Sequence, residues 1–236
     1  MKKLIYTLLE LIRLKPVVAI LCYHSISSDW QFGVPLQDFK KQITYLKSKY
    51  KFYSLLDLHN FLLGKKKLVS PGIVLTFDDG YQDILQVSSF LPDLGIRPTV
   101  FVTANPKEVD RLELDTKKRL LTKSEILRLH KLGWEIGCHS ATHPNFGRLT
   151  LSQHKSEITD AKHLLEKSLK TEIKYFAYPK GKHSPSIQKT VRQSGFNLAL
   201  SMDDSIISSF SNPFALPRVG VNATHSFTEF RSLPLL

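Results

Sequence analysis

The stretch Ile73-Val74-Leu75-Thr76-Phe77-Asp78-Asp79-Gly80-Tyr81 is a short apolar run that ends abruptly in two neighbouring carboxylates. The run predicts a buried strand, because a few consecutive apolar residues bounded by a turn signal are typical of a strand covered on both faces. Adjacent side chains diverge at a strand end, so Asp78 and Asp79 can divide two tasks, one binding a cation and the other accepting a proton. Gly80 permits the sharp turn that follows. An ordinary Asp-Asp-Gly turn, with Asp83 capping a helix, is the alternative, and this segment alone favours it.

Short apolar runs alternate with amphipathic segments along the rest of the chain, which is typical of β/α units and a largely parallel sheet. Strands are expected at Val17–Tyr23, Ile73–Phe77, Thr99–Thr103, Trp134–Cys138, Tyr175–Tyr178, Leu198–Ser201 and Arg218–Val221. Helices are expected over Leu36–Tyr50, 82–94 and 122–132. A long helix is marked by Ile158, Ala161, Leu165 and Leu169, and a further helix begins at Ser184-Pro185 and ends at Gly195. Residues 104–121 are expected to form an irregular insertion. Neither a linker nor a repeat is visible, so residues 17–236 are predicted to form one α/β barrel-like domain. Chemistry in such barrels gathers at the carboxyl ends of the strands.

A second polar cluster, Cys138-His139-Ser140-Ala141-Thr142-His143-Pro144, follows another predicted strand. Two histidines four residues apart have a metal-ligand spacing. A zincin helix would need Glu after the first histidine, where Ser140 stands, and the flanking Gly137 and Pro144 favour a loop after a strand. A site of two histidines and one carboxylate, with open positions for water and substrate, fits this setting. Two unrelated loop histidines are an equally good interpretation of the pair by itself.

A third segment, Ala177-Tyr178-Pro179-Lys180-Gly181, is apolar and then turns. Taken together, TFDDG, HSATH and YPKG resemble the NodB-homology polysaccharide deacetylases, carbohydrate esterase family 4. The resemblance runs from about Val17 to Val221. The opening LCYHSI of residues 21–26 and the closing Leu216-Pro217-Arg218 resemble the branch that includes poly-N-acetylglucosamine deacetylases. This resemblance implies a distorted (β/α) barrel of seven or eight strands.

The resemblance also assigns roles by position. It implies that Asp79, His139 and His143 bind a divalent metal, usually Zn²⁺ in this family, and that Asp78 is the general base. Tyr178 and Pro179 would line the substrate side, and the backbone N–H of Lys180 would help to hold the oxyanion.

Two departures from the family pattern concern the acid and the base. The late Leu-x-Leu-His motif, which supplies the general acid in many members, is missing, and in the branch this chain resembles the histidine comes from the first strand. His24 is therefore the candidate acid, with a buried structural histidine as the alternative, while His183 and His225 are kept outside the catalytic set. Ala177 replaces the arginine that steadies the base, and Arg218 either supplies the missing guanidinium or is an ordinary surface arginine.

The composition is that of a folded globular protein, with 42% apolar and 23% charged residues. The net charge of +12 raises the question of nucleic acid, but no basic cluster is interleaved with stacking aromatics, so no nucleic-acid partner is predicted. The net charge is then interpreted as a solvated basic surface or as a surface that attracts anionic polymers or lipid head groups. Two cysteines, Cys22 and Cys138, are too few for a disulfide framework. They are interpreted as buried core thiols, or as a pair whose side chains approach each other.

Residues 1–16 are predicted to form an amphipathic helix that packs on the domain or lies on a membrane. Leu4, Leu8, Leu11 and Ile12 repeat at helical spacing, while Glu10, Arg13 and Lys15 interrupt the apolar run that a secretion signal would need. The expected location is therefore the cytoplasm or the periphery of the cytoplasmic membrane, with secretion by an atypical signal left open.

The predicted function is metal-dependent hydrolysis of an N-acetyl group on an amino sugar, in a cell-envelope polysaccharide or on a lipid-linked glycan precursor. A phosphatase of the Asp-x-Asp type fits poorly, because the two carboxylates here are adjacent. A non-catalytic carbohydrate-binding barrel stays open, since the acid is uncertain and the usual arginine is missing.

Overall fold

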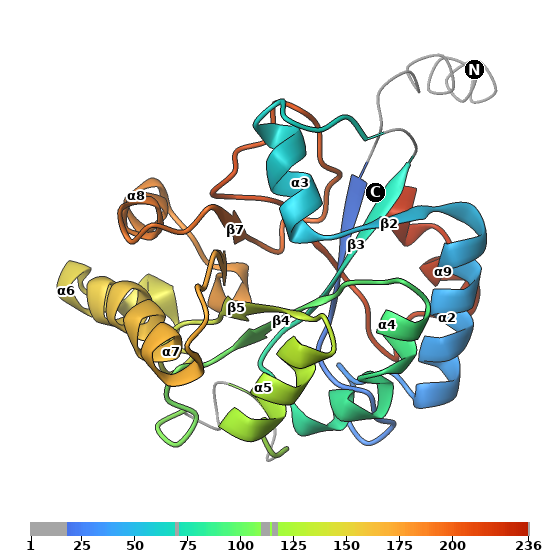
Figure 1. The fold of residues 1–236 in the computed structure, drawn as a ribbon, viewed down its shortest axis with the longest axis horizontal. Helices are drawn as coiled ribbons and strands as arrows, with labels where there is room; N and C mark the ends of the chain where they lie inside the picture. Colours follow the sequence, from blue (N-terminus) through green and yellow to red (C-terminus); the bar gives the residue numbers. More distant parts are fainter. Residues whose placement is uncertain (1–17, 69–70, 110–113, 115–117, 236) are drawn as a thin grey trace.

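The computed structural model describes residues 18–68, 71–109, 114 and 118–235. Its centre is a curled sheet of parallel strands, and the main path of the sheet runs β7-β6-β5-β4-β3-β1-β8, with β2 paired to β3 beside this path (Figure 1). The strands are β1 (Val18–Tyr23), β2 (Lys51–Tyr53), β3 (Gly72–Phe77), β4 (Thr99–Val102), β5 (Glu135–Cys138), β6 (Tyr175–Ala177), β7 (Leu198–Leu200) and β8 (Val219–Gly220). The predicted fold is confirmed, and the two strands that start and end the barrel, β1 and β8, are neighbours.

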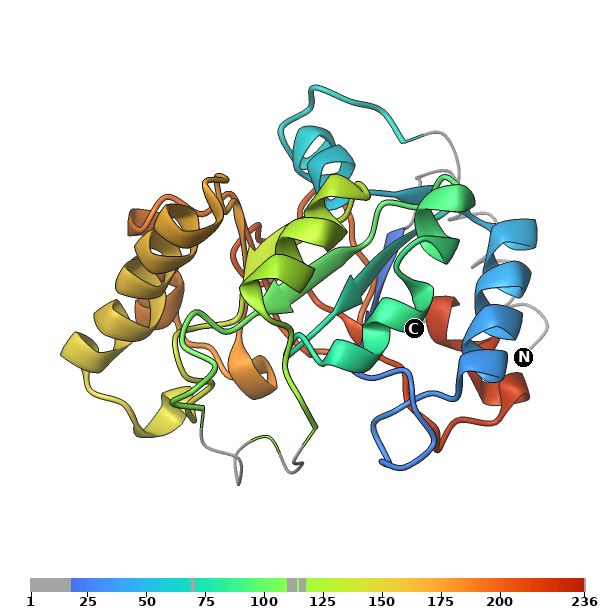
Figure 2. The same cartoon turned by 60° about the horizontal axis from the view of Figure 1, so that its bottom comes forward.

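Helices surround the outside of this sheet, as Figures 1 and 2 show from two directions. The α-helices are α2 (Leu36–Lys49), α3 (Leu55–Leu62), α4 (Phe90–Asp93), α5 (Lys123–Lys131), α6 (Leu151–Lys155), α7 (Ala161–Leu169), α8 (Pro185–Gln193) and α9 (Phe227–Phe230). A π-helical turn at Ser156–Asp160 joins α6 to α7, so the long predicted helix is present but not uniform. The predicted helix over residues 122–132 is present as α5, which Thr122 caps through a capping box with Glu125.

The continuous helix predicted over residues 82–94 is wrong. A 3₁₀-helix spans Gln82–Val87 and is followed by the short α4. Pro92 has no N–H to donate to the carbonyl of Ser88, and its ring would clash there in a regular helix. The carbonyl of Ser88 instead accepts a hydrogen bond from the indole of Trp134 at 2.9 Å.

Side-chain alternation along the strands divides the molecule into an inner and an outer core. In β1, Ala19 and Leu21 pack outward against the helices, whereas Val18 and Ile20 belong to the inner cluster. The same period of two carries Cys22 and the following His24 to the inner side. Polar residues at the carboxyl ends of several strands therefore converge inside the barrel.

The last extended segment closes the ring of strands. Leu216 forms an isolated parallel bridge with Leu200 of β7, and Val219 and Gly220 pair with β1 a few residues later. Arg218 lies between these two pairings and is completely buried. It is thereby carried to the inner side of the barrel, facing the end of β3.

The predicted N-terminal helix lies outside the described residues. Among the residues that the structure describes, no helix combines the length and the apolar character needed to cross a bilayer.

Candidate metal centre and active site

Three side chains predicted to bind metal converge at the carboxyl ends of β3 and β5. Asp79 Oδ1 lies 3.3 Å from His139 Nε2 and 3.2 Å from His143 Nε2, and all three residues are buried. Four-coordinate zinc with ligands at about 2.1 Å holds neighbouring ligand atoms about 3.4 Å apart, which is close to the spacing seen here. Asp79 Oδ1 has no hydrogen-bond partner among the described residues, so the donor set fits a divalent cation.

The protonation of His139 is set from its far side. Its Nδ1 lies 2.8 Å from the carbonyl oxygen of Ala177, which can only accept a hydrogen bond, so Nδ1 carries the proton and Nε2 faces Asp79. Burial by itself lowers the pKa of His139, but the carboxylates of Asp78 and Asp79 outweigh it, so the pKa is raised. Burial also opposes the ionisation of Asp79, but both histidines outweigh it and hold its pKa well below the usual value. This charge balance favours a cation among the three groups.

The loops that carry the three candidate ligands have strained backbone and are held by neighbouring side chains. Asp79, Ser140 and His143 all have positive φ, a region that is costly for residues other than glycine. The Ser140 hydroxyl accepts the N–H of His143 at 2.9 Å. Glu157, in the π-helical turn, accepts the N–H groups of residues 141 and 142 at 2.9 Å each. The strain persists because this network over-determines the backbone of the loop.

Asp78 points to a different partner from Asp79. Both of its oxygens lie 2.6 Å from the guanidinium of Arg218, in a bidentate pair that is buried on both sides. Arg218 also donates to the carbonyl of Ser201 at 3.0 Å. Burial would raise the pKa of Asp78, but Arg218 and His139 together lower it below its usual value. Arg218 is thus a buried partner of the candidate base and not a surface arginine.

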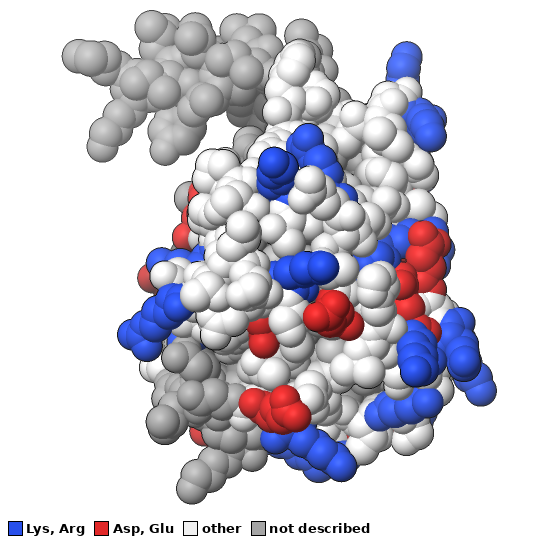
Figure 3. All heavy atoms as spheres, turned by 90° about the vertical axis from the view of Figure 1, so that its left-hand side faces the viewer, with Lys and Arg blue, Asp and Glu red and all other residues white. Residues whose placement is uncertain are grey.

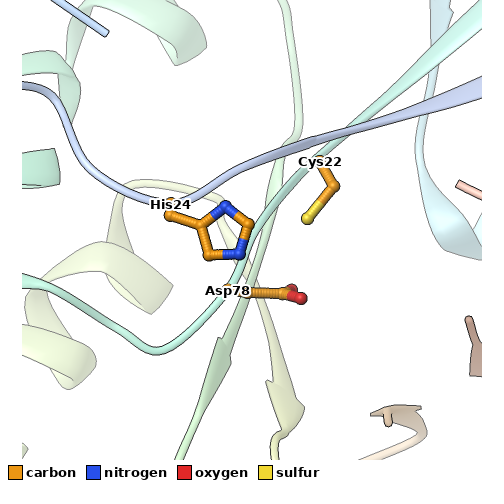
Figure 4. Close-up of side chains that lie close together, drawn as sticks. All are labelled: Cys22, His24 and Asp78. Atoms are coloured by element: carbon orange, nitrogen blue, oxygen red, sulfur yellow. The ribbon is translucent and has the colours of Figure 1, made fainter. Parts of the chain in front are cut away.

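His24 directly follows β1, and its ring lies close to the carboxylate of Asp78. Figure 4 shows its imidazole beside the Asp78 carboxylate, with the thiol of Cys22 adjacent. Burial lowers the pKa of His24, although Asp79 and Asp78 act in the opposite direction. Asp83 holds the adjoining backbone by accepting the N–H of Ile26 at 3.0 Å. Asp83 therefore holds this loop, whereas the alternative interpretation of the sequence made it a helix cap.

The third motif forms a tight turn at Pro179–Gly181. Lys180 has φ 54°, and Gly181 has φ 68° with Met202 so close that a Cβ would lie 2.7 Å from it. The buried Tyr178 donates its hydroxyl to the carbonyl of Phe214 at 2.9 Å. The side chain of Tyr178 thus packs in the core beside the turn. Lys180 contributes its backbone, with positive φ, to the turn itself.

A protein-family model for polysaccharide deacetylases matches residues 65–199, which contain all three motifs. The chain belongs to the polysaccharide deacetylase family. A putative polysaccharide deacetylase of Bacillus subtilis, YxkH, is 27% identical over 213 residues, covering 89% of this chain and 74% of the relative.

Solved structures of low sequence identity share the fold. IcaB from Ammonifex degensii matches with a TM-score of 0.81 at 19% identity, covering 94% of this chain and 98% of that one. The Streptococcus pyogenes deacetylase PplD matches with a TM-score of 0.76 at 19% identity and covers 93% and 98%. A de-N-acetylase from Aggregatibacter actinomycetemcomitans gives 0.73 at 14% identity, with 92% and 99% covered.

The two other candidate histidines, His183 and His225, form their hydrogen bonds with residues other than the candidate metal ligands and Asp78. His183 pairs with Asp203 at 3.0 Å and contacts Gln188. His225 sits in a turn, where its Nδ1 accepts the N–H of Asn222 at 3.4 Å. Both histidines are thus engaged in local contacts, whereas His24 lies against Asp78.

The two cysteines do not form the pair considered from the sequence. Cys22 on β1 and Cys138 on β5 are free and buried. The strands β3 and β4 lie between β1 and β5 in the sheet. Cys138 belongs to the outer core, whereas Cys22 faces the inner side.

Two supporting carboxylates, Glu157 and Asp83, carry no local signal of their role in the sequence. Glu157 lies in the π-helical turn before α7, and nothing in the neighbouring sequence marks it as the acceptor that holds the loop of the second motif. Asp83 was considered only as a helix cap. Both act on loops distant in sequence, so only the fold reveals them.

Basic residues are interspersed with acidic ones on the face that carries α7 and α8 (Figure 3). Exposed lysines and an arginine on these helices include Lys167, Lys189 and Arg192. The view shows no continuous basic stripe across this face.

Proposed function

We propose that this protein is a metal-dependent hydrolase that removes N-acetyl groups from an amino sugar. One observation carries the proposal: Asp79, His139 and His143 converge as a ligand set, while the adjacent Asp78 is held separately by Arg218. A site that only bound carbohydrate would have no need of an ionised carboxylate positioned beside a cation site. The bidentate Arg218 also places beside Asp78 the guanidinium that is missing from the third motif, the departure that left a non-catalytic barrel open.

The resident cation is proposed to be Zn²⁺, because two histidines and one carboxylate are a common catalytic zinc set. When bound, such an ion polarises the acetyl carbonyl and lowers the pKa of water toward about 7. Asp78, kept ionised by Arg218, takes the proton of the attacking water. His139 is oriented by its hydrogen bond to Ala177, which keeps Nε2 available as a ligand atom.

Two further roles, stabilising the oxyanion and protonating the leaving amine, are assigned to groups that follow β6 and β1. The backbone N–H of Lys180, in the strained turn after β6, is proposed to donate to the developing oxyanion. His24 is proposed to protonate the departing amine, since a neutral amine leaves far more readily than an anionic one. Its place against Asp78 is compatible with a proton passing between the two residues during the cycle.

The proposed substrate is an N-acetylglucosamine-type unit in a cell-envelope polymer or lipid-linked precursor. The rings of Trp30 and Phe32 lie 6.3 and 6.2 Å from the His24 ring, and the Phe32 side chain is partly exposed. Aromatic faces of this kind can pack against the apolar face of a sugar ring. An open groove lined in part by Ile26, Asp29 and Lys118 continues from this loop and leaves room for further polar sugar units.

Location and partners remain part of the proposal. We expect a protein of the cytoplasm or the membrane periphery, where the net charge of +12 would favour anionic surfaces or lipid-linked substrate over a neutral polymer. No nucleic-acid partner is proposed.

The test is acetate release from N-acetylglucosamine oligomers of the chito- and poly-β-1,6-linked types. Release is expected from the purified protein, should stop after chelation and should return with added Zn²⁺. Binding of the oligomers without acetate release, in protein that retains its metal, would favour the carbohydrate-binding alternative. Release that survives removal of all bound metal would refute metal dependence.

A further inference from the structure

Three potential metal ligands that the proposed reaction does not use together converge beside the active site. Cys22 Sγ, a ring nitrogen of His24 and a carboxylate oxygen of Asp78 all lie within 4.8 Å of one another. Figure 4 shows the thiol and the imidazole on the same side of β1, both turned toward the Asp78 carboxylate. They meet because Cys22 pairs in register with Thr76 on β3, two residues before Asp78.

This cluster is distinct from the set formed by Asp79, His139 and His143, and shares no residue with it. One thiolate, one imidazole and one carboxylate are the ligand types of zinc, and the thiolate selects against magnesium and calcium. Arg218 donates one hydrogen bond to each carboxylate oxygen of Asp78. A carboxylate has about four lone-pair sites, so Asp78 retains acceptor capacity while the pair persists.

Two features make this second set weaker than the first. The Arg218 guanidinium contacts Asp78 directly and repels a cation placed there. The Cys22 thiol must also lose its proton, and burial raises its pKa well above the usual value. On binding, the S–H bond breaks, a sulfur–metal bond forms and the proton leaves to solvent, without any change of oxidation state. An ion should therefore occupy this set only after the first set is filled.

We propose that Cys22, His24 and Asp78 form a second, inhibitory site for a sulfur-preferring divalent cation such as zinc. Occupation of the site withdraws the carboxylate and the imidazole to which the proposed function assigns proton transfer, so the inhibitory effect rests on that proposed function. The binding itself does not, because it depends only on the geometry of the three side chains. Excess zinc thus stops turnover without displacing the resident ion.

The first test measures binding without activity, by titrating Co²⁺ into protein freed of metal by chelation. A thiolate-to-cobalt charge-transfer band is expected only beyond the first equivalent, since the first set contains no sulfur. Cys22→Ser should abolish the band, and Cys138→Ser should keep it. Cys138 is the matched control, because it is equally buried but points toward the carbonyl of Ser140. Absence of the band, or its loss only in Cys138→Ser, would overturn the proposal.

The second test measures acetate release against free zinc, with each variant compared with its own rate at one equivalent. The parent protein and Cys138→Ser should be inhibited at the same zinc concentration. Cys22→Ser should need at least about tenfold more, since even the loss of supporting groups around a metal changes affinity about 10–100-fold. Equal inhibition of all three proteins would refute a role for Cys22.

The two tests distinguish a failure of the proposed hydrolase function from a failure of the proposed second metal site. If no acetate is released under any condition, the enzymatic assignment fails while the cobalt titration still decides whether the second site exists. If Cys22→Ser does not fold, which thermal unfolding would reveal, Cys22→Ala removes the ligand without burying a hydroxyl. The same two measurements then apply to that variant.

Discussion

Replacing Arg218 by methionine should lower both stability and activity by amounts that the structure bounds. Arg218 and Asp78 are almost completely buried and joined by two 2.6 Å hydrogen bonds. Methionine fills much of the volume but leaves the Asp78 carboxylate buried without its partner. Breaking a buried pair in this way costs about 3–5 kcal/mol. For a chain of this size each kcal/mol lowers Tm by about 2–4 °C, so the expected fall is about 6–20 °C.

The loss of activity has a separate cause. Without the guanidinium, burial raises the pKa of Asp78 and the base becomes protonated over more of the neutral range. Turnover should fall toward the level of a variant without a base, about 10²–10⁴-fold below the parent.

A double-mutant cycle separates the two effects. Asp78→Asn combined with Arg218→Met removes both charges, so it should recover much of the free energy of unfolding lost in Arg218→Met but none of the activity. Thermal and denaturant unfolding give the stabilities, and acetate release gives the rates. Arg128→Met, at an exposed arginine of α5, is the control and should stay within about 1 kcal/mol of the parent. A change of less than 1 kcal/mol in Arg218→Met, or additive effects in the double variant, would refute the reasoning.

Three further variants test individual roles in the proposed site. Asp78→Asn should keep its metal content, measured by elemental analysis, and lose about 10²–10⁴-fold in kcat, whereas Asp79→Asn should lose the metal itself; equal metal loss in both would contradict the division of labour. His24→Ala should lower kcat with normal metal content, while His225→Ala, the control, should retain its rate; the reverse pattern would transfer the acid role to His225. Phe32→Ala should raise KM for oligomers with little change in kcat, and an unchanged KM would remove Phe32 from the sugar-binding surface.

Local patterns in the chain were sufficient for most of the architecture. Apolar runs of four to seven residues predicted most of the buried strands, and local patterns also predicted α2, α5 and α8. These predictions succeed because a strand or helix is set largely by side chains a few residues apart. The continuous helix over residues 82–94 failed where one proline and a contact from Trp134 outweighed the periodicity. The short β2 and α3 were not predicted, although Ser54 and Asp57 form a capping box at the start of α3.

The candidate ligands were also visible in the sequence, but their arrangement was not. The motifs containing Asp79, His139 and His143 and their resemblance to a family predicted which residues belong together. Only the tertiary structure decided that Arg218 pairs with Asp78, 140 residues away in the chain, and that Cys22 turns toward the same carboxylate. The pairing arises because the segment from Leu216 to Gly220 closes the barrel between β7 and β1 and carries Arg218 inside. Local sequence determines which side chains alternate on a strand, whereas the closure of the sheet determines which strands those side chains meet.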